Sequence, residues 1–304
     1  MGDKYVFYFS GGVMAGVFGA GVAAGLIETE FERNFDIEAM YGGSAGVFTE
    51  AYYASRQPFP IGPSIYWDNL SRDFILGKNI PFGTFQRFCC RCFGCYPGRL
   101  VHAINIDLVM DIVSSGKKAL DIATLKACPF PVYIKLFDVK NKNWVFVDIR
   151  TYPNPLRLVK AAISMAPYYF SSENIYGSDC LDLCLADTLN LDLIASKHPG
   201  SRIVFIVNYN VDRKAGLLLK AVRLAEGVVA NFCFKEIDRV CFVKGVYKFQ
   251  QDVKGIKANP DMLLIYPSKK EEIKAFTTDP RKLKRVYEIG KQEAQKIVDF
   301  AKRQ

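Results

Sequence analysis

The chain has 304 residues, of which 50% are apolar and 23% charged, a composition typical of a globular protein and not of a disordered one. Its formal net charge of +9 predicts a general attraction to anionic surfaces such as phospholipid headgroups. No helix-turn-helix, zinc-finger or RNP pattern is present to indicate nucleic-acid binding. The longest apolar run, residues 13–27, is interrupted by four glycines and is too short to predict a transmembrane helix. We therefore expect no nucleic-acid partner and at most a peripheral contact with an anionic membrane.

The first residues lead directly into an apolar, strand-like segment, without the basic leader, long apolar stretch or cleavage site of a secretory signal. Gly2 does not begin an N-myristoylation motif, because Val6 stands where that motif has Ser or Thr. The nine cysteines cannot all pair within one chain, so a reducing compartment is the simpler interpretation. These features predict a cytoplasmic protein, peripheral to a membrane if it contacts one.

Four cysteines gather within residues 89–95, whose sequence is CCRCFGC. A surface cluster of this kind can bind zinc or carry lipid acylation. A structural zinc site, however, needs four tetrahedral donors at workable spacing, and His102 is the only histidine nearby. We interpret the cluster as reduced thiols and predict no metal and no cofactor.

The first sixty residues predict alternating strands and helices, the pattern of an α/β fold with a parallel sheet. The expected order is a strand over 5–9, a glycine loop over 10–12, a helix over 17–33, a strand over 37–41 and a helix over 45–55. Small residues in the first helix, among them Gly19, Gly21 and Gly25, favour close packing against the sheet.

Residues 57–100 are rich in proline, glycine and aromatic residues and lack a regular hydrophobic period. This composition predicts an irregular insertion over the sheet, a candidate lid, and not a second domain. No internal repeat or linker divides the chain, so residues 1–304 are expected to form a single domain.

Regular structure is expected again from residue 131 onward. Residues 131–139 and 143–149 are β-rich runs joined by a turn-like segment, which predicts a hairpin. Residues 202–207 predict a buried strand, and Asp212 is expected to cap a helix that runs through Leu224. Asp279 and Pro280 predict the start of a final helix docked on the core. Its apolar stripe comprises Leu283, Val286, Tyr287, Ala294, Ile297, Val298 and Ala301.

Ser44 occupies the centre of a Gly-x-Ser-x-Gly sequence, Gly42 to Gly46, between a predicted strand and a predicted helix. Flanking glycines permit a sharp turn that exposes and aims the serine hydroxyl. The helix that begins at Ala45 adds a dipole and a free backbone N–H, both of which favour an anion. A glycine-rich turn with a serine N-cap would give the same sequence, but the strand-to-helix context favours a nucleophile.

The loop after the first strand, Ser10 to Val13, is expected at the same edge of the sheet, where its backbone N–H groups are candidates for an oxyanion hole. A packing turn or a dinucleotide-binding loop is the alternative, although the Gly-x-Gly-x-x-Gly pattern is not met.

The general base is left open by the residues alone. A Ser-His-Asp triad could use only His102 or His198, and the latter reads better as an exposed residue at a helix C-terminus. A carboxylate is the economical choice. Four aspartates crowd one stretch of the chain: Asp179, Asp182, Asp187 and Asp192.

Four blocks together resemble the patatin-like phospholipase family, in particular its compact bacterial esterase-like branch. These are the loop over 10–16, the elbow over 42–46, the run over 162–170, and Asp182 with Asp187 after it. The C-terminal segments 265–268 and 286–290 are similar to that branch as well, so the resemblance covers nearly the whole chain.

The resemblance implies a three-layer α/β/α sandwich around a central, mostly parallel sheet, and a Ser44-Asp182 dyad without metal. In that mechanism Gly11, Gly12, Val13 and the Ala45 N–H hold the oxyanion. The implied activity is hydrolysis of phospholipid or lysophospholipid esters, with Asp187 as structural support for the loop that carries the base.

The sequence departs from the family pattern at four positions. Val13 replaces a loop glycine, Ala15 replaces a basic residue, and Leu183 and Cys184 follow the aspartate where the family has glycines. These departures motivate one alternative, a weakly active or inactive fold that binds lipid or a protein. Another alternative is a conventional α/β-hydrolase with His198 as base, which the early position of the nucleophile disfavours.

Overall fold

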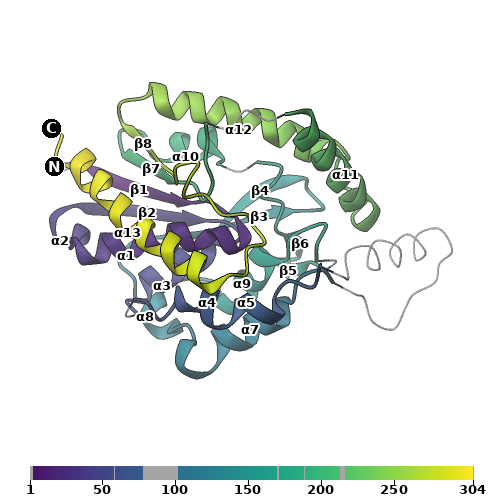
Figure 1. Ribbon diagram of the computed structural model, residues 1–304, viewed down its shortest axis with the longest axis horizontal. Coiled ribbons are helices and arrows are strands. Elements are labelled where there is room, and N and C mark those ends of the chain that lie inside the picture. Colours follow the sequence, from purple (N-terminus) through teal and green to yellow (C-terminus); the bar gives the residue numbers. More distant parts are fainter. Residues whose placement is uncertain are drawn as a thin grey trace.

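The computed structural model describes residues 3–57, 59–77, 102–169, 171–187, 189–212 and 216–303. Within these ranges one eight-stranded sheet forms the middle layer, and helices cover both of its faces (Figure 1). The strand order is β5-β6-β3-β2-β1-β7-β8, with β4 also paired to β3. In the part of this order that runs β3-β2-β1-β7-β8, adjacent strands are parallel, whereas β4 and β6 are antiparallel to β3. The predicted three-layer α/β/α fold with a mostly parallel sheet is confirmed.

The strands are β1 (Lys4–Phe9), β2 (Asp36–Gly42), β3 (Val132–Asp138), β4 (Asn143–Asp148), β5 (Glu173–Ile175), β6 (Ser178–Leu181), β7 (Arg202–Ile206) and β8 (Met262–Ile265). All five residues of β7 and all of β1 except Lys4 are buried, as expected for central parallel strands covered on both faces. The strands predicted near residues 5, 37, 131, 143 and 202 are therefore confirmed, including the hairpin.

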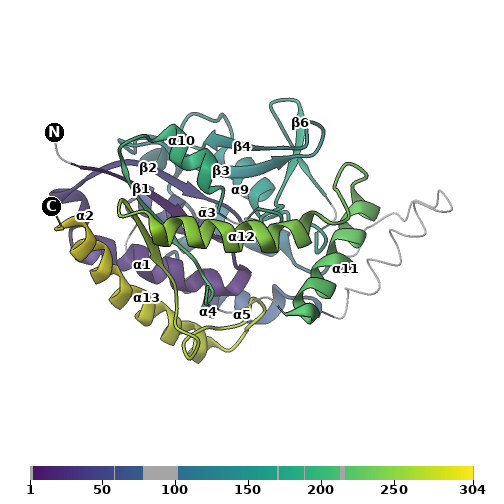
Figure 2. The ribbon, with the colours of Figure 1, turned by 90° about the horizontal axis from the view of Figure 1, so that it is seen from above.

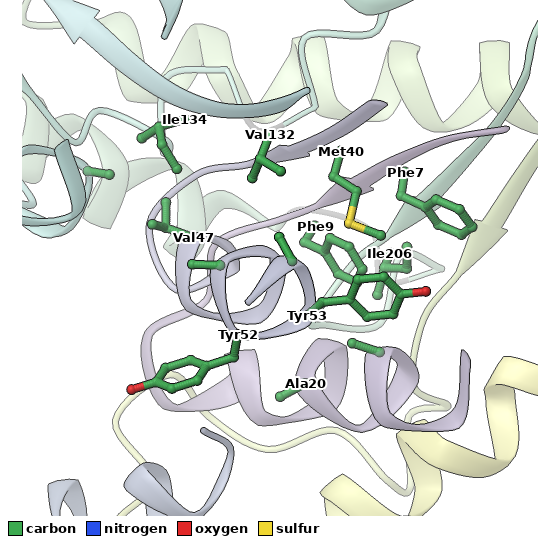
Figure 3. Close-up of a cluster of buried hydrophobic side chains, with 14 of the residues drawn as sticks. Phe7, Phe9, Ala20, Met40, Val47, Tyr52, Tyr53, Val132, Ile134 and Ile206 are labelled. Atoms are coloured by element: carbon green, nitrogen blue, oxygen red, sulfur yellow. The ribbon is translucent and has the colours of Figure 1, made fainter. Parts of the chain in front are cut away.

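One face of the sheet is covered by α1 (Val17–Glu28), α3 (Gly46–Ala54), α9 (Pro155–Ile163) and α13 (Pro280–Ala301). Smaller elements lie on the same side: η1 (Val13–Gly16), α2 (Phe31–Asn34), α4 (Ser64–Asp68), α5 (Leu70–Asp73), α7 (Ile106–Ser114), η3 (Gly116–Lys118) and α8 (Ile122–Lys126). Figure 3 shows strand side chains such as Phe9, Met40 and Ile134 pointing toward Val47 and Tyr53 of α3. The main core lies here.

The opposite face is covered by α10 (Leu191–Lys197) and α12 (Cys241–Ala258), and α11 (Leu217–Cys233) lies at the end of the molecule away from the two termini (Figures 1 and 2). Ile194 of α10 and Ile256 of α12 pack on Tyr8 and Phe205 in this smaller core. None of the helices in the described ranges is long and apolar enough to cross a bilayer.

The final helix docks as predicted, and every residue of its expected apolar stripe is buried. Asp279 caps it by accepting a hydrogen bond from the Arg281 N–H at 2.9 Å. The small residues of α1 explain how closely α13 approaches, since a Cβ at Gly21 would lie 2.1 Å from the Tyr287 carbonyl oxygen. The glycine-rich face of α1 thus packs partly against α13, and not only against the sheet as predicted from the sequence.

Three other boundaries differ from the sequence-based expectations. The helix predicted over 17–33 ends at Glu28, because Glu30 adopts a left-handed φ of 53° that turns α2 away. The helix expected from Asp212 begins at Leu217 and continues to Cys233. Instead of capping it, the Asp212 carboxylate pairs with Lys257 at 2.8 Å.

The segment expected to be irregular contains two short helices, α4 and α5, within residues 59–77. Their side chains Ile65, Trp67 and Leu70 are part of the main core, which gives this stretch a packing role. Residues 78–101, which include the cysteine cluster and most of the predicted lid, lie outside the described residues.

Candidate active site

Ser44 lies on a sharp turn between β2 and α3, as the sequence predicts. Its φ is +54°, a left-handed conformation that non-glycine residues adopt at a cost of about 1–2 kcal/mol. The two outer glycines make the turn possible: a Cβ at Gly46 would lie 2.1 Å from the Phe9 carbonyl oxygen, and one at Gly42 would lie 2.6 Å from the Glu50 carboxyl. The turn is therefore held in a strained form by close backbone packing, as expected for a nucleophile elbow.

The topology of the sheet brings Asp182 to this turn. One edge of β3 pairs with β4 along its whole length, so β2 and β6 share the other edge. On that edge Gly42 pairs with Ile134, and Leu181 pairs with Phe137. Because β2 and β6 run toward each other, their continuations, which carry Ser44 and Asp182, meet beside the middle of β3.

The backbone of Asp182 is fixed by the segment that follows α9. Its N–H donates to the Ser164 carbonyl at 3.1 Å, and its carbonyl accepts from the Ala166 N–H at 3.2 Å. The run over 162–170, singled out in the sequence, thus contains the residues that anchor the aspartate.

The Asp182 carboxyl is buried, and its Oδ1 accepts a hydrogen bond from the Cys184 N–H at 2.9 Å. Burial raises the pKa of this carboxyl above its usual value, whereas the Cys184 N–H and side chain, the Ser44 hydroxyl and Lys135 act to lower it. Ser44 and Asp182 follow the ends of β2 and β6 on the same edge of β3, and Asp182 Oδ2 has no hydrogen-bond partner among the described residues. Catalytic hydrogen bonds are often absent or poorly aligned before substrate binds, so the free Oδ2 does not rule out Asp182 as the base.

The glycine loop after β1 lies directly against the elbow. A Cβ at Gly11 would be 2.7 Å from Ser44 Cβ and 3.3 Å from Ser44 Oγ. Gly12 has a φ of 153° and Val13 a φ of 54°, so the chain turns sharply here into η1. Among the described residues, the N–H groups of Gly11, Gly12, Val13 and Ala45 donate no hydrogen bond, so all four are available to an anion.

Asn208, which the sequence analysis missed, holds this loop in place. Its Nδ2 donates to the carbonyl oxygens of Ser10 at 2.6 Å and Gly11 at 3.1 Å, and its Oδ1 accepts from the Gly19 N–H at 2.8 Å. The available signal was its position just after β7, because polar residues after central parallel strands lie at the carboxyl edge where α/β sites form.

A narrow apolar pocket of about 40 Å³ opens onto Ser44. The other residues that line it are Val13, Met14, Ala45, Phe48, Tyr66, Leu70, Phe74, Ile104, Val109, Ile163 and Met165. Among the described residues, the hydroxyl of Tyr66 is buried without a hydrogen-bond partner. It lies close to η1, since a Cβ built at Gly16 would be 2.5 Å from it. The pocket therefore offers the serine an environment that is almost entirely hydrocarbon.

The alternative bases lie in other settings. His198 ends α10 and is largely buried, not exposed as expected, with Nε2 at 2.7 Å from the Tyr41 hydroxyl and Nδ1 at 3.0 Å from Glu38 Oε1. The ring of His102 stacks on Tyr169, with centroids 4.1 Å apart. The contacts of both ring nitrogens of His198 are thus with Tyr41 and Glu38, and not with Ser44.

The three other aspartates of the crowded stretch also have separate roles. Asp179 is exposed in the β5–β6 hairpin, and Asp192 pairs with Lys248 at 2.5 Å. The Asp187 carboxylate accepts hydrogen bonds from the backbone and side chain of Asn190 at 2.9 and 2.7 Å. This last arrangement is consistent with Asp187 bracing the loop that follows Asp182.

Within the described ranges, no three histidine, cysteine or acidic side chains gather in a way that could hold a metal ion. Among the described cysteines, Cys128, Cys180 and Cys241 are free thiols.

No protein-family model and no curated protein matches this sequence. Among solved structures, the chain is similar to VipD from Legionella pneumophila, with 12% sequence identity and a TM-score of 0.49, over 98% of this chain and 67% of that one. At this distance the function has to be inferred from the residues and geometry of the chain itself.

Proposed function

We propose that the protein is a serine hydrolase of lipid acyl esters, with Ser44 as nucleophile and Asp182 as general base. The observation that carries the proposal is the setting of Ser44. It combines a left-handed turn, a buried carboxyl on the segment that meets the elbow beside β3, and an adjoining glycine loop whose backbone N–H groups donate no hydrogen bond among the described residues. Each of these features supplies one requirement of acyl transfer: an aimed oxygen, a proton acceptor and an oxyanion hole.

In the proposed reaction Ser44 Oγ attacks the carbonyl carbon of the ester while Asp182 takes its proton. The oxygen of the tetrahedral intermediate accepts hydrogen bonds from the N–H groups of Gly11, Gly12, Val13 and Ala45. The bond from carbon to the alcohol oxygen then breaks, and Asp182 returns the proton to the departing alcohol. A water molecule attacks the acyl-enzyme with Asp182 again as base, which releases the carboxylic acid and restores Ser44.

The apolar lining of the pocket supports a lipid acyl chain as the group bound next to Ser44. A cavity of about 40 Å³ is far smaller than the roughly 300–1,000 Å³ of typical ligand pockets, so lining side chains must move apart when a chain enters. Met14 and Met165 suit this role because unbranched methionine side chains repack easily. We therefore infer a phospholipid or lysophospholipid ester as substrate.

The exposed start of α11 supports contact with a membrane surface. Leu217 is 88% exposed and Leu218 80%, and Val222 and Leu224 are also exposed one to two turns later. Leucines so exposed at the end of a helix, with Lys220 between them, match the apolar and basic character of interfacial helices. We propose that this end of α11 enters the headgroup region of an anionic bilayer.

A lipid-binding protein without turnover is the second candidate. It is favoured by the incomplete hydrogen bond at Asp182 Oδ2 and by the burial that raises the pKa of this carboxyl. A carboxyl that stays protonated cannot accept the Ser44 proton.

Release of fatty acid from phosphatidylcholine and lysophosphatidylcholine in mixed micelles distinguishes the two candidates. The hydrolase proposal expects release by the wild type, and loss of release in Ser44→Ala and Asp182→Asn variants that remain folded. Binding of these lipids without release by any form would establish the second candidate.

Flotation with vesicles containing phosphatidylserine tests the contact of α11 with a membrane. The double variant Leu217→Ser/Leu218→Ser should stay unbound while still cleaving micellar substrate.

A further inference from the structure

Lys135 is a lysine in the middle of β3 whose side chain is only 1% exposed. Burying an ammonium group without compensation costs several kcal/mol, so buried lysines usually have a specific electrostatic partner or role. The acyl-transfer mechanism proposed above makes no use of this residue, although it lies close to the site.

The stem of Lys135 packs against the nucleophile elbow. A Cβ at Gly43 would lie 3.4 Å from Lys135 Cβ and 3.3 Å from its Cδ. On the strand, Lys135 stands between Ile134, which pairs with the end of β2, and Phe137, which pairs with the end of β6. It therefore occupies the position on β3 where the segments that carry Ser44 and Asp182 converge.

Among the described residues, no carboxylate bonds directly to the ammonium group of Lys135. Lys135 Nζ lies 3.3 Å from the Tyr8 hydroxyl, donates to the Asp187 backbone carbonyl, and lies 4.3 Å from the centre of the Trp144 ring. These are neutral acceptors and an aromatic face. The carboxylate of Asp187 itself is taken up by Asn190.

The titratable groups around this charge come from three parts of the chain: Tyr8 on β1, Asp182 and Cys184 after β6, and Asp187 in the loop beyond them. Burial raises the pKa of both Tyr8 and Cys184, which keeps these two groups neutral. Asp187 already accepts two hydrogen bonds from Asn190, whereas Asp182 is the carboxyl near Lys135 whose protonation the mechanism depends on, and it forms no ion pair within the described residues.

We propose that Lys135 is a positioning residue that keeps the buried Asp182 carboxyl ionised beside Ser44. A positive charge at the junction of β2, β3 and β6 offsets the free-energy cost of ionising a carboxyl in this apolar site. The aliphatic stem of Lys135 packs against Gly43 of the elbow. The inference deepens the proposed hydrolase function and rests on it.

The pH dependence of Ser44 labelling by a fluorophosphonate probe tests the proposal. Lys135→Met removes the charge and keeps an unbranched stem against Gly43, while Lys244→Met, at an exposed ion pair with Asp238, is the matched control. The labelling rate should rise with pH as the base loses its proton. In Lys135→Met this rise should move to higher pH, whereas Lys244→Met should follow the wild type.

Two labelling results would overturn the inference while the hydrolase proposal stands: an unchanged profile in Lys135→Met, or an equal loss at every pH with the shape retained. Absence of labelling in the wild type would instead overturn the hydrolase proposal itself.

A measurement on the wild type covers the case in which Lys135→Met does not fold. Infrared difference spectra recorded over a range of pH report the protonation of this carboxyl directly, and the Asp182→Asn variant assigns its carboxyl band. The proposal expects carboxylate throughout the pH range in which Ser44 is labelled fastest. A protonated Asp182 in that range would contradict it.

Discussion

Replacing Gly11 with alanine tests whether the loop after β1 holds its backbone against the nucleophile. The new Cβ would lie 2.7 Å from Ser44 Cβ. Carbon atoms in contact are about 3.5–4.0 Å apart, so one of the two segments must retreat by roughly 1 Å. Because a misplacement of this size can cost about 100-fold in rate, kcat/KM for p-nitrophenyl butyrate should fall by about that factor, or about 2.7 kcal/mol of barrier.

Gly216→Ala is the matched control, since its φ is −74° and nothing lies within 4 Å of a Cβ built there. The crowding at Gly11 is local, so the free energy of unfolding in urea should fall by no more than about 3 kcal/mol. If the Gly11→Ala enzyme is folded and hydrolyses the ester as fast as Gly216→Ala, the loop does not contact Ser44 in solution. The oxyanion assignment would then be wrong.

Three further substitutions give distinct signatures. Both oxygens of the Glu50 carboxyl are buried without a hydrogen-bond partner among the described residues, and burial raises its pKa well above 4.5. Above about pH 4.5 the unfolded chain therefore releases a proton that the folded state keeps, so the folded protein loses about 1.4 kcal/mol of stability for each pH unit until the raised pKa is reached. The gain in unfolding free energy of Glu50→Gln over wild type should therefore grow as the pH rises above about 4.5, and a pH-independent difference would refute the burial argument. Ser44→Gly relieves the left-handed φ at this position, although the glycine also raises the conformational entropy of the unfolded chain. The net effect should make Ser44→Gly more stable than Ser44→Ala by about 0.5–1 kcal/mol, and equal stability would show that the turn is unstrained. His198→Ala should lower stability by about 1–2 kcal/mol through its lost contacts with Tyr41 and Glu38, with probe labelling of Ser44 intact; loss of labelling in a folded variant would restore the triad alternative.

The elements that the sequence predicted well have strong local signals. The central strands are apolar runs bounded by glycine or polar residues, and Asp279 with Pro280 marks a helix start through capping chemistry. The end of α1 could not be predicted, because the helix stops through a left-handed φ at Glu30, where the chain turns to bury Phe31 in the main core. The start of α11 was misplaced because Asp212 has the composition of a cap but uses its carboxylate on Lys257.

The candidate site divides in the same way. The elbow at Ser44 is a local feature of five residues and lies where the sequence predicts it. The four aspartates of the stretch from Asp179 to Asp192, in contrast, could not be told apart by composition. The position of Asp182 beside Ser44 depends on β6 meeting β2 along one edge of β3, and such a long-range pairing leaves no local trace. Lys135 had one signal, a charged residue within an apolar strand, and its meaning depends on the same junction.

The most direct test of the account is intact-protein and peptide mass spectrometry after treatment with a fluorophosphonate at neutral pH. We predict one covalent adduct per chain, located on Ser44, absent from Ser44→Ala and strongly slowed in Asp182→Asn, while circular dichroism shows both variants folded. If folded wild-type protein forms no adduct on Ser44, the proposed nucleophile is wrong. If Asp182→Asn reacts as fast as wild type, the proposed base is wrong.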